Sequence, residues 1–255
     1  MKSKRMSQQY SIQNIQFRTG DIILMSRNNF GSKTISRVIK CEYNHVGIIY
    51  VEVRTHQVFI WEMNMNGPRL VALEEWMHRG AQVLRRDIDA VAWVPIHRID
   101  PTTNQYIDRN NAQEYERYTT RLESWIQYCI MLPMKFNLTS FLNIALKAIS
   151  VNNFRLRNLV EKTITGDERV NVPIYEQPTM VTCSGMVIAS LYHLNILDVR
   201  VMDHNMTNIL DIVCPTDFVQ QSEIDQFMSH SKFGTLVPID IQKSEDQNHL
   251  GAQKN

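Results

Sequence analysis

The segment from Val181 to Leu194 constrains the fold more than any other part of the chain. It begins with β-branched residues that lead into Thr182, a frequent helix-capping residue, and continues with apolar side chains at helical spacing. Cys183 is therefore expected in the first turn of a helix that directly follows an extended segment. At such a position the unpaired backbone N–H groups and the helix dipole stabilise a thiolate, and the same groups can stabilise an oxyanion.

A second informative segment begins far upstream, at His45. Two β-rich runs cover residues 46–53 and 57–63, and the polar sequence Arg54-Thr55-His56 separates them, which predicts a β-hairpin. If the turn centres near Arg54 and no bulge interrupts the pairing, His45 and Glu62 lie on the same face as opposite or diagonal neighbours.

Glu62 would then be suited to orient the histidine. A carboxylate beside an imidazole accepts the ring N–H and fixes the tautomer. The ordinary structural alternative is that Glu62 faces solvent on a half-covered strand. Three other residues compete for the orienting role: Glu42, Asn64 and His56.

Composition excludes several classes of function. Of the 255 residues, 44% are hydrophobic and 21% are charged, which is typical of a globular protein, and the net charge of +1 gives no drive toward nucleic acid. The four cysteines show no CxxC spacing, so we expect no metal and no cofactor. A metal site formed by Cys41, His45 and Cys183 is the alternative with the least support.

The chain contains no run of eighteen apolar residues and no apolar segment after its basic N-terminus. We therefore expect an intracellular protein with reduced thiols and without a transmembrane segment. Residues 138–151 come closest to such a segment and are expected to form a core helix, with peripheral membrane contact as the alternative.

The remaining chain is expected to form one domain over residues 17–241, preceded by a flexible arm (1–16) and followed by a disordered tail (242–255). Residues 112–165 are expected to be a helical segment, because apolar side chains recur at helical spacing between Tyr118 and Ile130. Shorter elements are expected as strands after Asp21, at 91–96 and near 235–237, and as helices at 71–79 and after Cys214. Asp21 itself is expected to secure a turn.

Four short motifs carry a resemblance to a known family: Gly20-Asp21-Ile22-Ile23, Asn44-His45-Val46-Gly47-Ile48, Glu62 near the end of the next strand, and Thr182-Cys183-Ser184. Cys214-Pro215-Thr216-Asp217-Phe218 is a weaker fifth. In this order they resemble the circularly permuted NlpC-type papain-like hydrolases, in which the histidine precedes the cysteine. The likeness is to the YiiX/YaeF branch, which has poxviral and giant-virus members, and more distantly to lecithin retinol acyltransferase.

The resemblance implies an α+β, permuted papain-like fold, in which an antiparallel sheet or barrel packs against the helix that carries the cysteine. It implies Cys183 as nucleophile, His45 as general base and Glu62 as the third member of the site. The implied substrate is a peptide-like amide or a lipid acyl bond, and a viral member would work in the host cytoplasm or the virion. A papain-like scaffold that has become a binding module without catalysis is the competing hypothesis.

Overall fold

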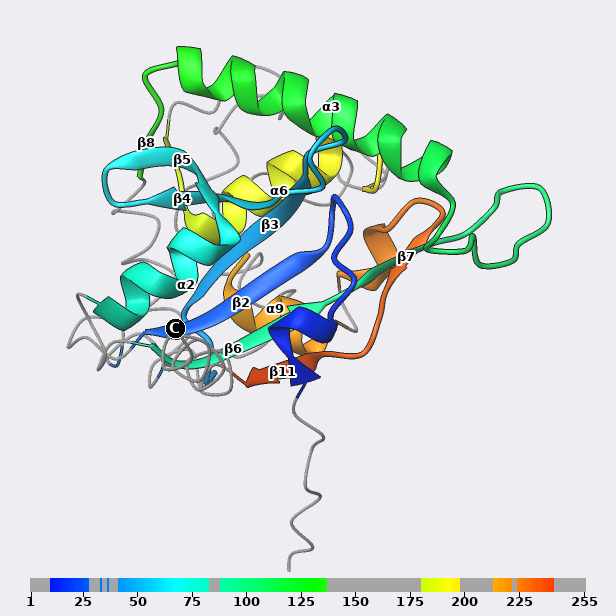
Figure 1. Cartoon of the computed structure of the whole chain (residues 1–255). Coiled ribbons are helices and arrows are strands. Elements are labelled where there is room, and N and C mark those ends of the chain that lie inside the picture. The colour runs from blue at the N-terminus through cyan, green and yellow to red at the C-terminus, as the bar shows by residue number, and fades with distance from the viewer. Residues whose placement is uncertain are drawn as a thin grey trace, which may run out of the picture.

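The computed structural model describes residues 10–27, 33, 36, 41–82, 88–136, 180–197, 213–221 and 224–240. Over these residues the protein is α+β, as expected. Its main sheet has seven strands in the order β1-β11-β6-β2-β3-β4-β5, and every neighbouring pair is antiparallel except β1 and β11 (Figure 1). Two further pairs, β7 with β10 and β8 with β9, lie outside this sheet.

The strands of the main sheet are β1 (Tyr10–Ser11), β2 (Ile22–Arg27), β3 (His45–Val51), β4 (Val58–Asn64), β5 (Gly67–Ala72), β6 (Ile88–Val94) and β11 (Val237–Asp240). The short pairs are β7 (Ile96–Arg98) with β10 (Ser231–Phe233) and β8 (Lys135–Phe136) with β9 (Met180–Val181). The described helices are α2 (Leu73–Gln82), α3 (Ala112–Met131), α6 (Cys183–His193) and α9 (Pro215–Gln220), with 3-10 turns η1 (Ile12–Asn14) and η2 (Asp225–Phe227).

The sheet is buried on both faces, which explains its nearly continuous apolar strands. In β2, Ile22 and Leu24 belong to a core cluster that also contains residues of α3 and α6, whereas Ile23 and Met25 belong to a second cluster that contains residues of α2. Helices α3 and α6 therefore cover one face and α2 covers the other (Figure 1). The alternation along each strand decides which side chains meet which helix.

Asp21 secures the turn before β2, as predicted, and does more. Its carboxylate accepts the backbone N–H of Arg18 at 2.9 Å, and it also accepts the Trp93 indole and the Ile96 backbone N–H, each at 2.9 Å. The Arg109 guanidinium donates a hydrogen bond to each carboxylate oxygen, at 3.1 and 2.7 Å. Asp21 is 1% exposed, so this single buried charge joins the start of β2 to the β6–β7 junction and to the loop before α3.

Three expectations need correction. Residues 1–16 were expected to be a flexible arm, but Tyr10–Ser11 form β1, which pairs with β11, and Ile12–Asn14 form a 3-10 turn. The single strand expected near 235–237 is two strands, β10 and β11, on either side of residues 234–236. Ile130 was placed on the buried stripe of α3 but is 58% exposed, although the other predicted members of that stripe are buried.

Several expected segments lie outside the described residues. These are the part of the helical segment beyond residue 136, the core helix expected at 138–151, the surface loops expected at 166–178 and 199–208, and the tail from 242. The part of the 112–165 segment that the structure describes begins as predicted with α3, which is capped by the Asn111 side chain. It is not helical throughout, because residues 135–136 form β8.

Candidate active site

The β3–β4 hairpin places Glu62 beside His45. Ile48 pairs with Trp61 and Val51 with Val58, so the turn centres where the sequence predicts and Glu62 lies diagonally from His45. Glu62 Oε2 is 2.6 Å from His45 Nε2, and the two side chains are almost fully buried. The predicted proximity of these residues is confirmed.

Gly47 allows the two strands to approach at this point. A Cβ atom on Gly47 would lie 2.7 Å from Ile60 Cγ2, 3.2 Å from the carbonyl oxygen of Trp61 and 3.5 Å from Glu62 Cβ. The first of these distances is far shorter than real contacts allow. Glycine is therefore needed here for close packing between strands.

The substitution Gly47→Ala is expected to destabilise the protein by about 1–3 kcal/mol, since the added methyl group must push β4 away from β3. Thermal unfolding measures this loss, and Thr120→Ala, on the exposed surface of α3, is the control, with an expected change within about 0.5 kcal/mol. Equal melting temperatures for Gly47→Ala and wild type would contradict the packing argument.

Glu62 is held by two further side chains that the sequence did not reveal. Arg69 on β5 donates its Nε to Glu62 Oε1 at 2.6 Å and its second terminal nitrogen to the same oxygen. The Trp76 indole on α2 donates to Glu62 Oε2 at 3.2 Å. Burial of Glu62 alone would raise its pKa, but His45, Arg69 and Arg27 outweigh burial and hold the pKa well below its usual value. Glu62 is therefore a carboxylate.

The sequence indicates a hairpin next to Glu62 but not the pairing of Glu62 with Arg69. The Asn66-Gly67 dipeptide is a strong hairpin signal, and a two-residue turn formed by it would pair Glu62 with Val71. The turn instead consists of Met65 and Asn66, and this shift of the register brings Arg69 directly opposite Glu62. Trp76 was expected to face inward, and it is 4% exposed, but nothing in the sequence indicates that its indole N–H meets Glu62.

Cys183 is the first residue of α6, directly after β9. The predicted cap is confirmed, because the Thr182 hydroxyl accepts the backbone N–H of Gly185 at 3.0 Å. Cys183 is 4% exposed. Among the residues that the structure describes, no acceptor is bonded to the backbone N–H groups of Cys183 and Ser184, so both can donate to another group.

The start of α6 meets the start of β3. The thiol of Cys183 lies beside the His45 ring and the backbone N–H of Val46, close enough for both to act on its pKa, and Ser184 Oγ lies 4.0 Å from the sulfur. Because His45 Nε2 faces Glu62, Nδ1 is the nitrogen left for the thiol. Cys183, His45 and Glu62 thus form one continuous chain of neighbouring side chains from α6 through β3 to β4, with a hydrogen bond between His45 and Glu62.

The electrostatics of this chain favour a charged pair. Burial opposes ionisation of Cys183, but the hydrogen bond and charge of His45, with Ser184 and the Val46 N–H, lower its pKa below the usual value of 9.0. Burial and the charge of Arg27 disfavour protonated His45, but Glu62 and the bond to Cys183 outweigh them and raise its pKa above 6.5. The arrangement therefore stabilises a thiolate beside an imidazolium.

The other cysteines differ from Cys183. Burial raises the pKa of Cys129 to about 12 and also raises that of Cys41. Both residues are core side chains, and among the described residues no basic group lowers the pKa of either thiol. Cys129 was predicted to be inert, and its burial within α3 agrees with this prediction.

The alternative orienting residues lie elsewhere. Asn64 Oδ1 accepts the backbone N–H of Asn66 within the β4–β5 turn. His56 is exposed in the β3–β4 loop, where its φ is 56°, and Glu42 is exposed. Among the hydrogen bonds of the described residues, none joins these three side chains to His45, and Glu62 is its carboxylate partner.

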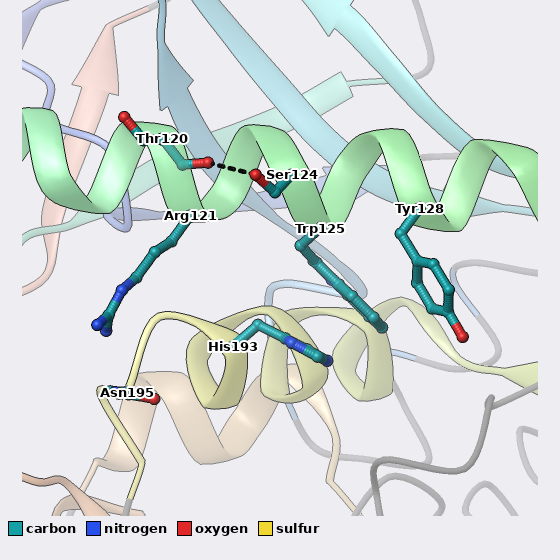
Figure 2. Close-up of a pocket in the computed structure, with 7 residues that line it drawn as sticks. All are labelled: Thr120, Arg121, Ser124, Trp125, Tyr128, His193 and Asn195. Carbon is teal, nitrogen blue, oxygen red and sulfur yellow. Dashed lines mark hydrogen bonds between the residues drawn. The ribbon is translucent and has the colours of Figure 1, made fainter.

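A pocket of about 590 Å³ lies at the other end of α6, between α3 and the residues His193 and Asn195. Figure 2 shows the Trp125 indole against the His193 ring, with the ring centroids 3.7 Å apart. Burial lowers the pKa of His193 to about 4, so this histidine is neutral at pH 7. The eleven-residue length of α6 places the pocket roughly 15 Å from Cys183, so it is separate from the Cys183–His45–Glu62 chain.

Within the described residues, no group of three His, Cys, Asp or Glu side chains is arranged to hold a metal ion. In particular, both sides of the His45 ring are engaged, one by Glu62 and the other by Cys183. The described part of the chain also has no helix whose length and apolar character would suffice to cross a membrane.

Comparison with known proteins gives little further information. No family model matches the chain, and no curated protein matches it. Among solved structures, the chain is weakly similar to the metalloprotein YiiX (DUF1105) from Escherichia coli O157:H7, with 11% identity and a TM-score of 0.39 over 87% of this chain and 98% of that chain. The chemistry of the site therefore has to be derived from its own residues.

Proposed function

We propose that this chain is a thiol hydrolase or acyltransferase of the permuted papain-like type, acting on an amide or ester bond. The observation that carries the proposal is the chain of neighbouring side chains Cys183, His45 and Glu62. It combines a cysteine of lowered pKa with a histidine of raised pKa and a buried carboxylate. A nucleophile, a base and an orienting group in contact are the elements of covalent catalysis.

In the proposed mechanism, His45 takes the proton of Cys183, and the thiolate attacks the carbonyl carbon of the substrate. The backbone N–H groups of Cys183 and Ser184, which have no acceptor among the described residues, stabilise the oxyanion. His45 then gives the proton to the leaving amine or alcohol, which departs and leaves an acyl group on Cys183. Water, or an acceptor in a transferase, resolves this thioester with His45 acting as base.

Glu62 holds the proton on Nε2 of His45 and stabilises the imidazolium that forms during the reaction. It stays ionised throughout, because Arg69, Trp76 and His45 together donate to both of its oxygens. The role of Glu62 is therefore electrostatic and positional rather than that of an acid.

The test is to incubate the protein with p-nitrophenyl esters of short and long fatty acids and with peptide p-nitroanilides. Release of nitrophenol or nitroaniline and the intact mass of the protein are then followed together. We expect an acyl adduct on Cys183 with at least one of these classes, and no adduct at this position and no turnover for Cys183→Ala. If Cys183→Ala turns over these compounds as fast as wild type, or if no compound acylates Cys183, the binding-module hypothesis takes the place of the enzyme.

A further inference from the structure

We propose that Arg69 is a positioning residue of this site. By hydrogen-bonding to one oxygen of Glu62, it holds the other oxygen toward His45. The inference rests on the proposed function. It assigns Arg69 a role in setting the acid limb of the pH–rate profile, which is the pH range in which the reaction rate of Cys183 falls as the solution becomes more acidic.

The two oxygens of Glu62 are divided between different partners. Among the described residues, Arg69 is the hydrogen-bond donor to Oε1, through its Nε at 2.6 Å and through a terminal nitrogen. Oε2 accepts from His45 at 2.6 Å and from the Trp76 indole at 3.2 Å. The two hydrogen bonds from Arg69 form a fork that holds Oε1 in the plane of the guanidinium. Because the carboxylate group is rigid, the fork also fixes the position of Oε2.

The fork depends on the β4–β5 hairpin. Arg69 is directly opposite Glu62, and the hairpin closes through Asn64 paired with Gly67, whose φ of 120° favours glycine. This turn fixes the register, and the register puts the guanidinium beside the carboxylate. The positioning is therefore built into the backbone rather than into a flexible loop.

Because Glu62 is buried, its ionised form depends on the positive charge of Arg69. The Glu62 side chain is 0% exposed, whereas that of Arg69 is 33% exposed. Burial of a carboxylate favours its neutral form unless opposite charges and hydrogen bonds compensate. Arg69 supplies both to Glu62, and its own side chain reaches solvent, so its replacement leaves little empty volume in the core.

The charged and titratable groups around the pair come from every neighbouring element. His45 on β3 and Arg69 on β5 contact Glu62 directly, and Arg27 on β2 acts on both Glu62 and His45 through its charge. Cys183 on α6 faces His45, and α2 contributes the uncharged indole N–H of Trp76. Once Arg69 is removed, the charge of Arg27 still acts on Glu62, but the same charge disfavours the imidazolium form of His45.

Loss of Arg69 should therefore allow Glu62 to take a proton at a higher pH than in wild type. Once Glu62 is neutral, it no longer stabilises the imidazolium of His45, and the thiolate of Cys183 loses its counterion. Wild type keeps Glu62 ionised, so its acid limb reports the ionisation of Cys183 alone. In the variant the acid limb should lie at higher pH, by roughly 1–2 pH units, because an arginine next to a carboxyl lowers its pKa by about 1–3.

The experiment measures the rate of alkylation of Cys183 by the neutral reagent iodoacetamide between pH 4 and 9, read by peptide mass spectrometry. The variants are Arg69→Met, which removes the charge, and Arg69→Lys, which keeps the charge but loses the fork. We expect Arg69→Met to shift the acid limb to higher pH by roughly 1–2 pH units, and Arg69→Lys to shift it by less than half as much.

A matched control separates positioning from general structural damage. Arg109 also makes two hydrogen bonds to a buried carboxylate, one to each oxygen of Asp21, away from Cys183. Arg109→Met should lower the melting temperature but leave the acid limb at the wild-type pH. Circular dichroism of each variant at the pH of measurement confirms that it is folded, and if Arg69→Met does not fold, Arg69→Lys decides the question.

The outcomes separate the two proposals. If wild-type Cys183 is no more reactive at low pH than the other cysteines, the proposed function fails. If wild type shows the enhanced reactivity but both Arg69 variants keep its acid limb, the enzyme stands and the positioning role of Arg69 is overturned. A shift of equal size in Arg109→Met would also overturn it, since the effect would then come from destabilisation.

Discussion

Replacement of His45 by alanine is expected to lower the rate of Cys183 acylation by an activated ester by roughly 10²–10⁴-fold at neutral pH, the range typical for a general base. The variant loses the proton acceptor, and it also loses the hydrogen bond and the charge that lower the pKa of Cys183. Burial then remains as the dominant effect on the thiol, so its pKa rises and little thiolate forms. Stopped-flow release of p-nitrophenol measures the rate.

His56→Ala is the matched control, because His56 is an exposed histidine in the loop of the same hairpin. It should acylate at the wild-type rate. His45→Ala should also show a rate that increases with pH up to the alkaline range, since the thiol then ionises without help. A His45→Ala protein that reacts within a few-fold of wild type at pH 6 would remove His45 from the mechanism.

Replacement of Glu62 by glutamine is expected to destabilise the fold by about 3 kcal/mol, which is the lower end for breaking a buried ion pair from one side. The carboxylate is fully buried, and glutamine keeps only one acceptor oxygen and no charge, so one of Arg69 and His45 faces an NH2 group and neither has a counterion there. The lower end applies because Arg69 can turn toward solvent. Chemical denaturation measures the change, and Glu114→Gln, which breaks a longer, partly exposed pair with Arg98, should cost less than about 1 kcal/mol.

The contribution of the pair to stability should depend on pH in a defined way. Glu62 has a lowered pKa, so its contribution is complete above its ordinary value of 4.5 and is lost as the pH falls toward the folded-state pKa. His45 has a raised pKa, so its contribution is complete below 6.5 and is lost as the pH rises through the folded-state pKa. The stability difference between the proteins with and without Glu62 should therefore be largest between pH 4.5 and 6.5.

This pH dependence is best measured in a Cys183→Ala background, where the thiol no longer titrates with the pair. Melting temperatures of Cys183→Ala and of Cys183→Ala with Glu62→Gln are compared from pH 3 to 9. We expect their difference to pass through a maximum in the window given above. A stability difference that stays constant across the whole pH range would contradict these contacts, because it would mean that unfolding does not change the protonation of Glu62 or His45.

The part of the site that follows from local rules could be predicted from the sequence. A short hairpin has few registers, so the spacing of His45 and Glu62 around Arg54 was sufficient to place them together. Thr182 before a run of helical spacing was sufficient to place Cys183 at a helix start. Such predictions need only the periodicity of a strand or helix and the chemistry of one cap or turn.

The contacts that depend on packing between distant elements could not be predicted. Residue periodicity shows that Trp76 faces inward but not which group its indole meets, and the Arg109 fork on Asp21 spans a separation of 88 residues. The same limit explains Ile130, which lies next to the buried Cys129 but at the edge of the buried face of α3, where its side chain is exposed. Near residue 234, Gly234 donates its backbone N–H to the carbonyl oxygen of Pro95, and β10 and β11 lie on either side of this contact.

The most direct test of the account is the pH dependence of alkylation of all four cysteines in the native protein, resolved by peptide mass spectrometry. The account predicts that Cys183 reacts fast well below pH 8.5, the ordinary pKa of a free thiol. Cys129 and Cys41, whose pKa values burial raises, should react only when the protein unfolds. If Cys183 reacts no faster than these two at pH 6, it is not paired with His45 as a thiolate, and the proposed enzyme is wrong.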